Sequence, residues 1–143
     1  MKALIKRASR SILLIVSAPF AVFADLIDAQ RALLNGQFSE ALEFAHEIAD
    51  THPVDAALIS ARALIELGNP KEAERYAAFA VRVAPKSFSA RLLLATAQRH
   101  LGKDFYAELN FRRALDIADK PTDRRIARIA ACRQRTGLHR CGV

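Results

Sequence analysis

The chain has 143 residues, which is enough for one domain and little more. Its formal net charge of +7 is unevenly distributed. Residues 25–119 carry 11 Lys/Arg against 14 Asp/Glu, whereas residues 120–143 carry 7 against 1, so a mildly acidic body precedes a basic end.

The first 24 residues have the order of regions that is typical of a secretory signal peptide. "MKALIKRASR" contains four basic residues and no acid, and the mostly apolar "SILLIVSAPFAVF" follows it, ending before Ala24. A short membrane anchor is the alternative, but the apolar run falls below the roughly 20 residues that a spanning helix needs. We therefore expect cleavage after Ala24 and a periplasmic location for the remaining chain. No cysteine lies near this point, which disfavours a lipidated N-terminus.

The next 95 residues contain an internal repeat. Gly36, Gly68 and Gly102 lie 32 and 34 residues apart, and an alanine follows each of them five residues later. An alanine also lies seven residues before each glycine, Ile48, Ala80 and Ala114 lie twelve residues after, and a proline recurs seventeen after the first two. The repeat positions are Ala29, Gly36, Ala41, Pro53, Ala61, Gly68, Ala73, Ala80, Pro85, Ala95, Gly102, Ala107 and Ala114.

Each repeat carries the signals of two helices joined by a tight turn. A glycine after an apolar helix adopts the left-handed conformation that ends the helix. In the second repeat Asn69 then offers an N-cap, Pro70 the first helical residue and Glu72 the third. The recurring alanines let the two helix backbones approach closely, and a larger side chain there would overpack the pair.

This pattern resembles the tetratricopeptide repeat family, whose unit is a pair of antiparallel helices. "GQFSEALEFAHEIADTHP", "GNPKEAERYAAFAVRVAP" and "GKDFYAELNFRRALDIAD" carry the resemblance, which covers residues 25–119. It implies an all-α, right-handed α-solenoid with units at about 25–53, 54–85 and 86–119. The chain departs from the family pattern at Ile48, where a small residue is usual, and after Pro53, where the helix begins two residues early.

Residues 120–136 are predicted to form a capping helix that covers the apolar side of the last repeat. Pro121 stops the preceding element, Thr122 or Asp123 can cap, and Ile126, Ile129 and Ala130 share one face. The prediction is thus seven helices without a strand, followed by a flexible tail over residues 137–143.

The sequence gives little reason to expect catalysis. The four histidines, at positions 46, 52, 100 and 139, lack the spacing of a helical metal pair, and surface positions explain them better. Motifs for phosphate loops, serine hydrolases and zinc proteases do not occur. The serines at positions 39, 60, 87 and 89 are interpreted as helix caps or surface residues. We therefore predict a non-enzymatic protein without catalytic residues, cofactor or metal.

The two cysteines, Cys132 and Cys141, lie nine residues apart in a chain that is expected to enter an oxidising compartment. A disulfide between them would tie the tail to the last helix and contribute about 2–3 kcal/mol. The alternative is two thiols on a frayed tail.

The resemblance also implies a binding groove on the concave face, lined by the first helix of each unit. The groove positions are Leu26, Gln30, Leu33, Asp55, Leu58, Arg62, Ile65, Glu66, Ser89, Leu92, Thr96, Arg99 and His100, with Leu34 beside them. An extended peptide or a helix could lie there; alternatively, the leucines and Ile65 only pack within the solenoid.

One well-known version of the fold grips a C-terminal carboxylate with lysine, asparagine and arginine side chains. The matching positions here are Leu26, Gln30, Ile59, Ser89 and Leu93, so this carboxylate clamp is absent and a chaperone-tail adaptor is disfavoured.

These features favour a periplasmic scaffold that binds a protein segment in its concave groove. The alternative is an envelope or outer-membrane assembly component whose basic C-terminal helix meets an anionic membrane surface, because the basic end favours anionic lipid or an acidic protein over nucleic acid. The sequence leaves the partner and the oligomeric state open.

Overall fold

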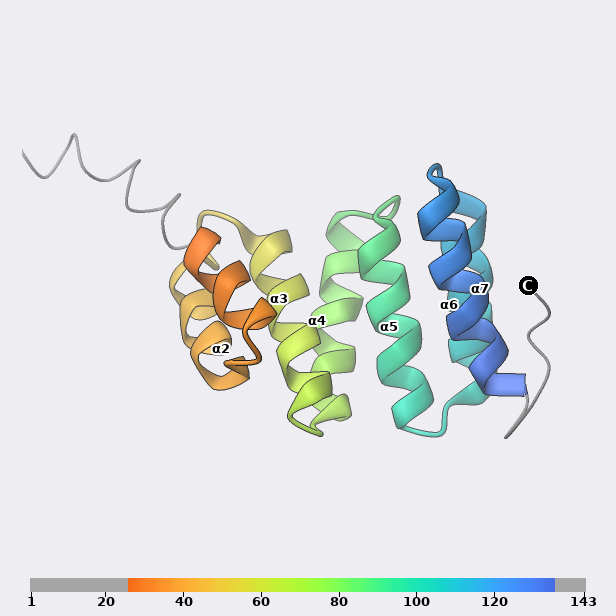
Figure 1. Ribbon diagram of the computed structural model, residues 1–143, viewed down its shortest axis with the longest axis horizontal. Helices are drawn as coiled ribbons and strands as arrows, with labels where there is room; N and C mark the ends of the chain where they lie inside the picture. Colours follow the sequence, from red (N-terminus) through yellow and green to blue (C-terminus); the bar gives the residue numbers. More distant parts are fainter. Residues whose placement is uncertain (1–25, 136–143) are drawn as a thin grey trace, which may run out of the picture.

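The computed structural model describes residues 26–135, and every regular element in that range is an α-helix (Figure 1). Seven helices without a strand in this part of the chain confirm the predicted all-α class. A first helix covers residues 26–34, and it is followed by α2 (Phe38–Glu47), α3 (Pro53–Glu66), α4 (Pro70–Val83), α5 (Phe88–His100), α6 (Asp104–Ile117) and α7 (Pro121–Arg135). The predicted signal peptide and the predicted tail lie outside the described residues.

The helices form two layers, and consecutive helices alternate between them. In Figure 1 the first helix, α3, α5 and α7 lie nearer the viewer, and α4 and α6 lie behind them. Helix α3 contacts α5, and α5 contacts α7, whereas the backbones of α2 and α4, and likewise those of α4 and α6, lie farther apart. Because the members of the first layer touch and those of the second are spread apart, the stack curves with the first helix, α3, α5 and α7 on its inner side.

Glycines make the turn inside each helix pair, as the repeat predicts. Gly36, Gly68 and Gly102 have φ angles of 76°, 76° and 70°. At Gly68 this left-handed residue lets the next amide, that of Asn69, return to the carbonyl of Leu64 at 2.8 Å, which is the helix-ending hydrogen bond of a Schellman motif. The Asn69 side chain then accepts from the backbone N–H of Glu72 at 3.5 Å, so the predicted cap of α4 is confirmed.

The prolines of the repeat have different roles in successive units. Pro53 is the first residue of α3, whereas Pro85 lies in the turn before α5. There the Ser87 hydroxyl caps the helix by accepting from the N–H of Ala90 at 3.3 Å. Pro121, predicted to stop the preceding element, is itself the first residue of α7, a position that suits proline because its missing N–H would have no partner there.

The core consists mostly of alanine. Eight repeat alanines are fully buried, namely Ala29, Ala41, Ala61, Ala73, Ala80, Ala95, Ala107 and Ala114. Their burial confirms that the recurring small residues are the contacts between helices. The two largest fully buried side chains among the described residues are Ile48 and Phe111. Ile48 stands at the repeat position of Ala80 and Ala114, so the departure from the family pattern is accommodated inside the first unit.

Helix α7 packs on α5 and α6 and covers the end of the third unit, as predicted. Only part of the predicted face makes this contact. Ala127 is buried and Ala130 packs against the cluster around Phe111, whereas Ile126 and Ile129 are each 47% exposed. The placement of Ile126 and Ile129 on the packed face was wrong, whereas that of Ala130 is confirmed.

No helix within residues 26–135 combines the length and the apolar character that crossing a membrane requires.

Candidate functional site

The second unit supplies the middle of the predicted concave groove. Arg62 and Glu66 are exposed on α3 and form an ion pair in which Nε donates to Oε1 at 3.2 Å. Leu58 and Ile65 are half-buried: Leu58 packs against a cluster that includes Ala90 of α5, and Ile65 against one that includes Ala97 of α5. These apolar side chains therefore join neighbouring helices and also keep part of their surface available. Asp55, half-buried, lies one turn earlier.

The third unit uses several predicted groove side chains for internal contacts. The hydroxyl of Thr96 donates to the carbonyl of Leu92 at 2.8 Å. Arg99 donates to the carbonyl of Ala130 in α7 at 3.0 Å and lies over the Phe111 ring, 5.5 Å from its centroid. Only Leu92, which is half-buried, and the exposed residues at positions 89 and 100 are left to face a ligand at this end.

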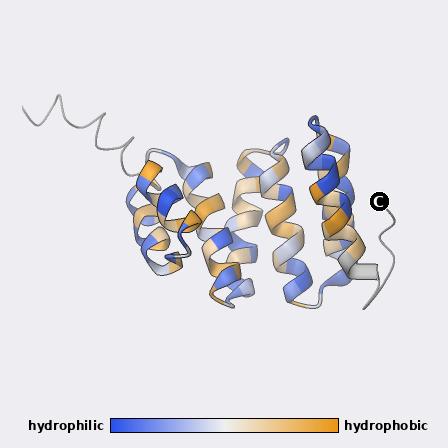
Figure 2. Ribbon diagram, viewed as in Figure 1, coloured by the Kyte–Doolittle hydropathy of each residue, from blue (hydrophilic) through white to orange (hydrophobic). Residues whose placement is uncertain are grey.

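In the first unit Leu26 and Leu33 are half-buried and pack against the N-terminal apolar cluster, whereas Gln30 is exposed. Leu34 is 87% exposed. Figure 2 shows that the near layer of helices carries both hydrophobic and hydrophilic residues. The concave face is thus a mixed surface with half-buried apolar side chains beside a few charges.

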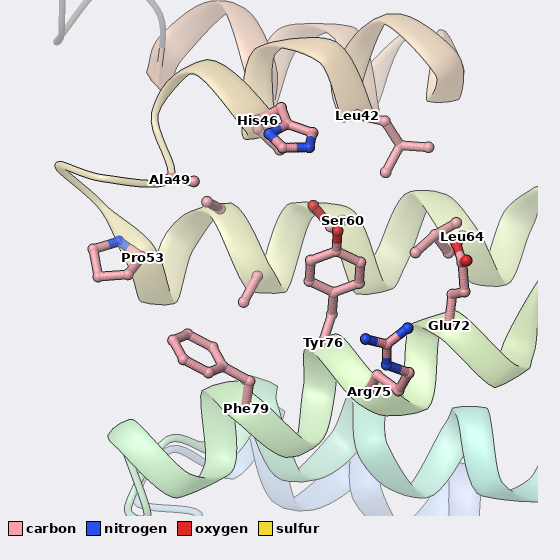
Figure 3. A pocket seen from close by; sticks show the side chains of 13 residues that line it. Leu42, His46, Ala49, Pro53, Ser60, Leu64, Glu72, Arg75, Tyr76 and Phe79 are labelled. Atoms are coloured by element: carbon pink, nitrogen blue, oxygen red, sulfur yellow. The ribbon is translucent and has the colours of Figure 1, made fainter.

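A hollow of about 550 Å³ lies on the opposite side of α3 from Arg62, between α2 and α4 (Figure 3). Its α3 residues recur at four-residue spacing, which places them along one helix face. The lining residues are Leu42, Ala45, His46, Ala49, Pro53, Ala56, Ala57, Ser60, Leu64, Glu72, Arg75, Tyr76 and Phe79. This hollow was not predicted from the sequence, because the family resemblance implies only a site on the concave face.

Polar groups from three helices reach the hollow. Figure 3 shows His46 projecting from α2 and Arg75 and Tyr76 from α4, toward the same space into which Ser60 points from α3. Ser60 is only 6% exposed, and its hydroxyl has no hydrogen-bond partner within residues 26–135. The interpretation of Ser60 as a cap or surface residue was therefore wrong: it lies in the middle of α3, facing the hollow.

Helix α7 presents a surface on which arginines and isoleucines are exposed side by side. On α7 the exposed Ile126 and Ile129 alternate with Arg125 and Arg128, which are also exposed. Cys132 lies on the same helix, whereas Cys141 lies outside the described residues. The predicted disulfide between them therefore stays a prediction.

In the described part of the chain no three His, Cys, Asp or Glu residues are placed to hold a metal ion together.

Comparisons with known proteins identify the architecture. No family model matches the chain, and no curated protein matches it either. Several solved structures are similar to it. The Arabidopsis OM64 TPR domain has a TM-score of 0.71 at 23% identity, over 82% of this chain and 97% of that one.

Two further structures are similar. The first TPR domain of human RPAP3 has a TM-score of 0.66 at 17% identity, over 82% of this chain and 97% of its own. The first TPR of Spaghetti (RPAP3), bound to the HSP90 peptide SRMEEVD, has a TM-score of 0.68 at 17% identity, over 80% of this chain and 94% of its own. At these identities the similarity establishes the fold.

Proposed function

Because the chain has the tetratricopeptide-repeat fold, we propose that it is a non-enzymatic periplasmic scaffold that binds a segment of another protein on its concave face. Similar structures hold peptides: the first TPR of Spaghetti (RPAP3) is bound to an HSP90 peptide, and the second TPR domain of human RPAP3 is in complex with an HSP70 peptide.

The observation that carries the proposal is the mixed surface of α3 and α5. Leu58, Ile65 and Leu92 are half-buried apolar anchors, and the exposed pair of Arg62 and Glu66 lies beside them. A bound segment would cover the exposed part of these anchors and exchange hydrogen bonds with the charged pair.

The mode of recognition differs from the gripping of a terminal carboxylate. Of the positions that form such a clamp elsewhere, Ile59 is buried and Leu93 is half-buried and packed against Leu94. Gln30 and Ser89 are exposed but uncharged. The surface therefore suits an internal segment with apolar side chains better than a chain terminus.

The proposal is tested by capturing partners from a periplasmic extract and measuring the affinity of each partner for defined variants. Arg62→Ala and Leu92→Ala should each weaken binding, by about tenfold where the residue is a hot spot. Arg112→Ala is the matched control, because Arg112 is an exposed arginine that also pairs with a carboxylate one helical turn away, but on α6. Partners that bind both groove variants as tightly as the unchanged protein would refute a concave site.

A second candidate function is supported by the outward face of α7. Exposed isoleucines beside arginines match the composition of helices that lie at an anionic membrane surface. On this alternative the protein is an envelope or outer-membrane assembly component that acts through its basic C-terminal helix.

Vesicle co-sedimentation separates the two functions. Binding through α7 requires anionic vesicles, weakens steeply with salt and is lost when Arg125 and Arg128 are replaced by glutamine, whereas groove binding persists in moderate salt. Equal binding to neutral and anionic vesicles would exclude the membrane role proposed for α7.

A further inference from the structure

The repeat makes two places in the stack equivalent, each between two outer helices with an inner helix as its floor, and we call them the first and the second groove. The first lies between α2 and α4 over α3, and the second between α4 and α6 over α5. Counting from the repeat glycines, Ser60 in the first groove corresponds to Leu94 in the second, and Ala45 corresponds to Ala77. Corresponding positions show how the protein fills each groove.

In the second groove a large side chain meets a small one. Leu94 of α5 packs against Ala77 of α4 in one cluster with Ala61. At the same place in the first groove, both members of the pair are small, Ser60 and Ala45, and both line the hollow. Within residues 26–135 no side chain takes, in the first groove, the space that Leu94 fills one unit later, and this leaves the hollow.

The second groove is also closed by polar contacts. The Asn110 amide donates to Gln98 Oε1 at 2.9 Å, the Gln98 amide donates to Glu74 Oε1 at 3.3 Å, and Lys103 donates to Glu74 Oε2 at 2.6 Å. Arg91 adds a donor to Asn110 Oδ1 at 3.3 Å. Every polar side chain of this network therefore has a partner inside the protein.

Burial of this network perturbs one of its members. Desolvation, and after it the positive charge of Arg113, lowers the pKa of Arg91 from its ordinary value. The hydrogen bonds that Arg91 donates to Asn110 and to the carbonyl of Pro85 offset the desolvation of its guanidinium.

The described residues that line the first groove form no equivalent network of hydrogen bonds. Its floor is alanine, Ser60 and Leu64, and its α4 wall is Tyr76 and Phe79. The Ser60 hydroxyl points into this space without a partner among residues 26–135, which is unfavourable for a buried donor unless something else binds it. A hollow of about 550 Å³ is within the usual size range of ligand sites.

One cation also points at the hollow. Arg75 extends from α4 toward it (Figure 3), and its guanidinium takes part in no ion pair or hydrogen bond within the described chain. Arginine prefers planar anions such as carboxylates, which it can bind with two parallel hydrogen bonds. Glu72 lies one turn away at the same rim and disfavours a ligand with more than one negative charge.

We propose that the hollow between α2, α3 and α4 is a second binding site, for a small and mostly apolar monocarboxylate. The apolar body of the ligand lies on the alanine floor beside the Tyr76 and Phe79 rings. Its carboxylate binds Arg75, and the hydroxyl of Ser60 donates a hydrogen bond to a ligand oxygen. This site is independent of the concave face, because it uses the opposite side of α3.

Three related probes test both the site and the charge of the ligand: 2-naphthoate, neutral 2-naphthalenemethanol and cationic 2-naphthylmethylammonium. Each is titrated into the purified protein and followed by amide chemical shifts and calorimetry. We expect 2-naphthoate to bind saturably at one site, more tightly than the other two, and to shift amides of α2, α3 and α4 around Ser60. Shifts confined to the concave residues, or equal affinity for the three probes, would overturn the proposal.

Variants locate the contacts. Ser60→Leu places in the first groove the residue that fills the second and should abolish naphthoate binding, with helicity measured to show that the fold persists. Arg75→Gln, an exposed change that leaves the core intact, should weaken naphthoate binding about tenfold and leave the neutral alcohol unaffected. Arg62→Gln, on the opposite face of α3, is the control and should change neither. Naphthoate binding that survives both Ser60→Leu and Arg75→Gln would contradict the assignment.

Discussion

Replacing Phe111 with alanine tests how the third unit and α7 are held together. Phe111 is completely buried, and it packs with Ala95 and Ala107 and against Leu92 and Ala130. It stands at the repeat position that is alanine in the two earlier units, at Ala45 and Ala77. No other fully buried aromatic side chain occurs among the described residues.

The magnitude follows from these surroundings. Replacing a core phenylalanine with alanine costs about 3–5 kcal/mol, and the cost depends on how far the site can collapse. Most of the neighbours of Phe111 are alanines in helices, which have no side chain to move into the space, so the cost should lie in the upper half of that range. The cation–π contact with Arg99, at 5.5 Å, is lost at the same time.

A loss of this size is a large fraction of the roughly 5–15 kcal/mol that stabilises a typical domain. Urea unfolding followed by circular dichroism should show it directly, and the melting temperature should fall by roughly 15–20 °C. Phe111→Leu, which keeps most of the volume, is the control and should cost less than about 1.5 kcal/mol. Hydrogen exchange should show that amides of α7 lose protection before those of α3.

A decrease of less than about 1 kcal/mol in the free energy of unfolding of Phe111→Ala would contradict this role of the Phe111 ring. Protection that is kept in α7 and lost in α3 would contradict it as well, because a repeat stack transmits a local defect mainly to the neighbouring unit.

Three further predictions concern a buried alanine, a turn glycine and a buried asparagine of the stack. Ala73→Leu should destabilise the fold by about 1–3 kcal/mol in urea unfolding, because Ala73 is fully buried, whereas Ala78→Leu on the exposed side of the same helix should be nearly neutral. Gly68→Ala should cost about 1–2 kcal/mol through backbone strain alone, since φ is +76° and no atom lies within 4 Å of an added Cβ; a neutral result would contradict this. Asn110→Ala should cost about 1–3 kcal/mol in thermal unfolding, because the partners of the Asn110 side chain lose their hydrogen bonds while buried or half-buried.

Much of the fold could be predicted from the sequence, because a repeated constraint leaves a repeated residue. A turn that needs positive φ requires glycine three times, at Gly36, Gly68 and Gly102. A close helix contact requires alanine in each unit, and these alanines are buried. The packed face of α7 was harder to predict, because this helix occurs only once and its inward face had to be inferred from hydrophobicity. The more hydrophobic Ile126 and Ile129 are exposed.

The candidate sites were less predictable. Arg99 and Thr96 occupy groove positions by register, but α7 and the helix backbone use their polar groups, which only three-dimensional contacts reveal. The hollow results from two coinciding small residues, Ser60 and Ala45, on different helices. The sequence does contain a sign of the hollow, because Ser60 stands at the repeat position of Leu94 in the next unit. This difference becomes visible only when corresponding residues are compared by the volume of their side chains.

The two largest buried side chains have a mechanical consequence. Ile48 and Phe111 lie near opposite ends of the stack, and each replaces an alanine of the repeat. Between them, Leu64 and Leu94 are also buried, and each of them shares a cluster with two alanines of neighbouring helices. Every unit thus holds a large side chain against small ones, and because such close-packed contacts do not deform continuously, the curvature of the inner surface is set by the stack itself before a partner is bound.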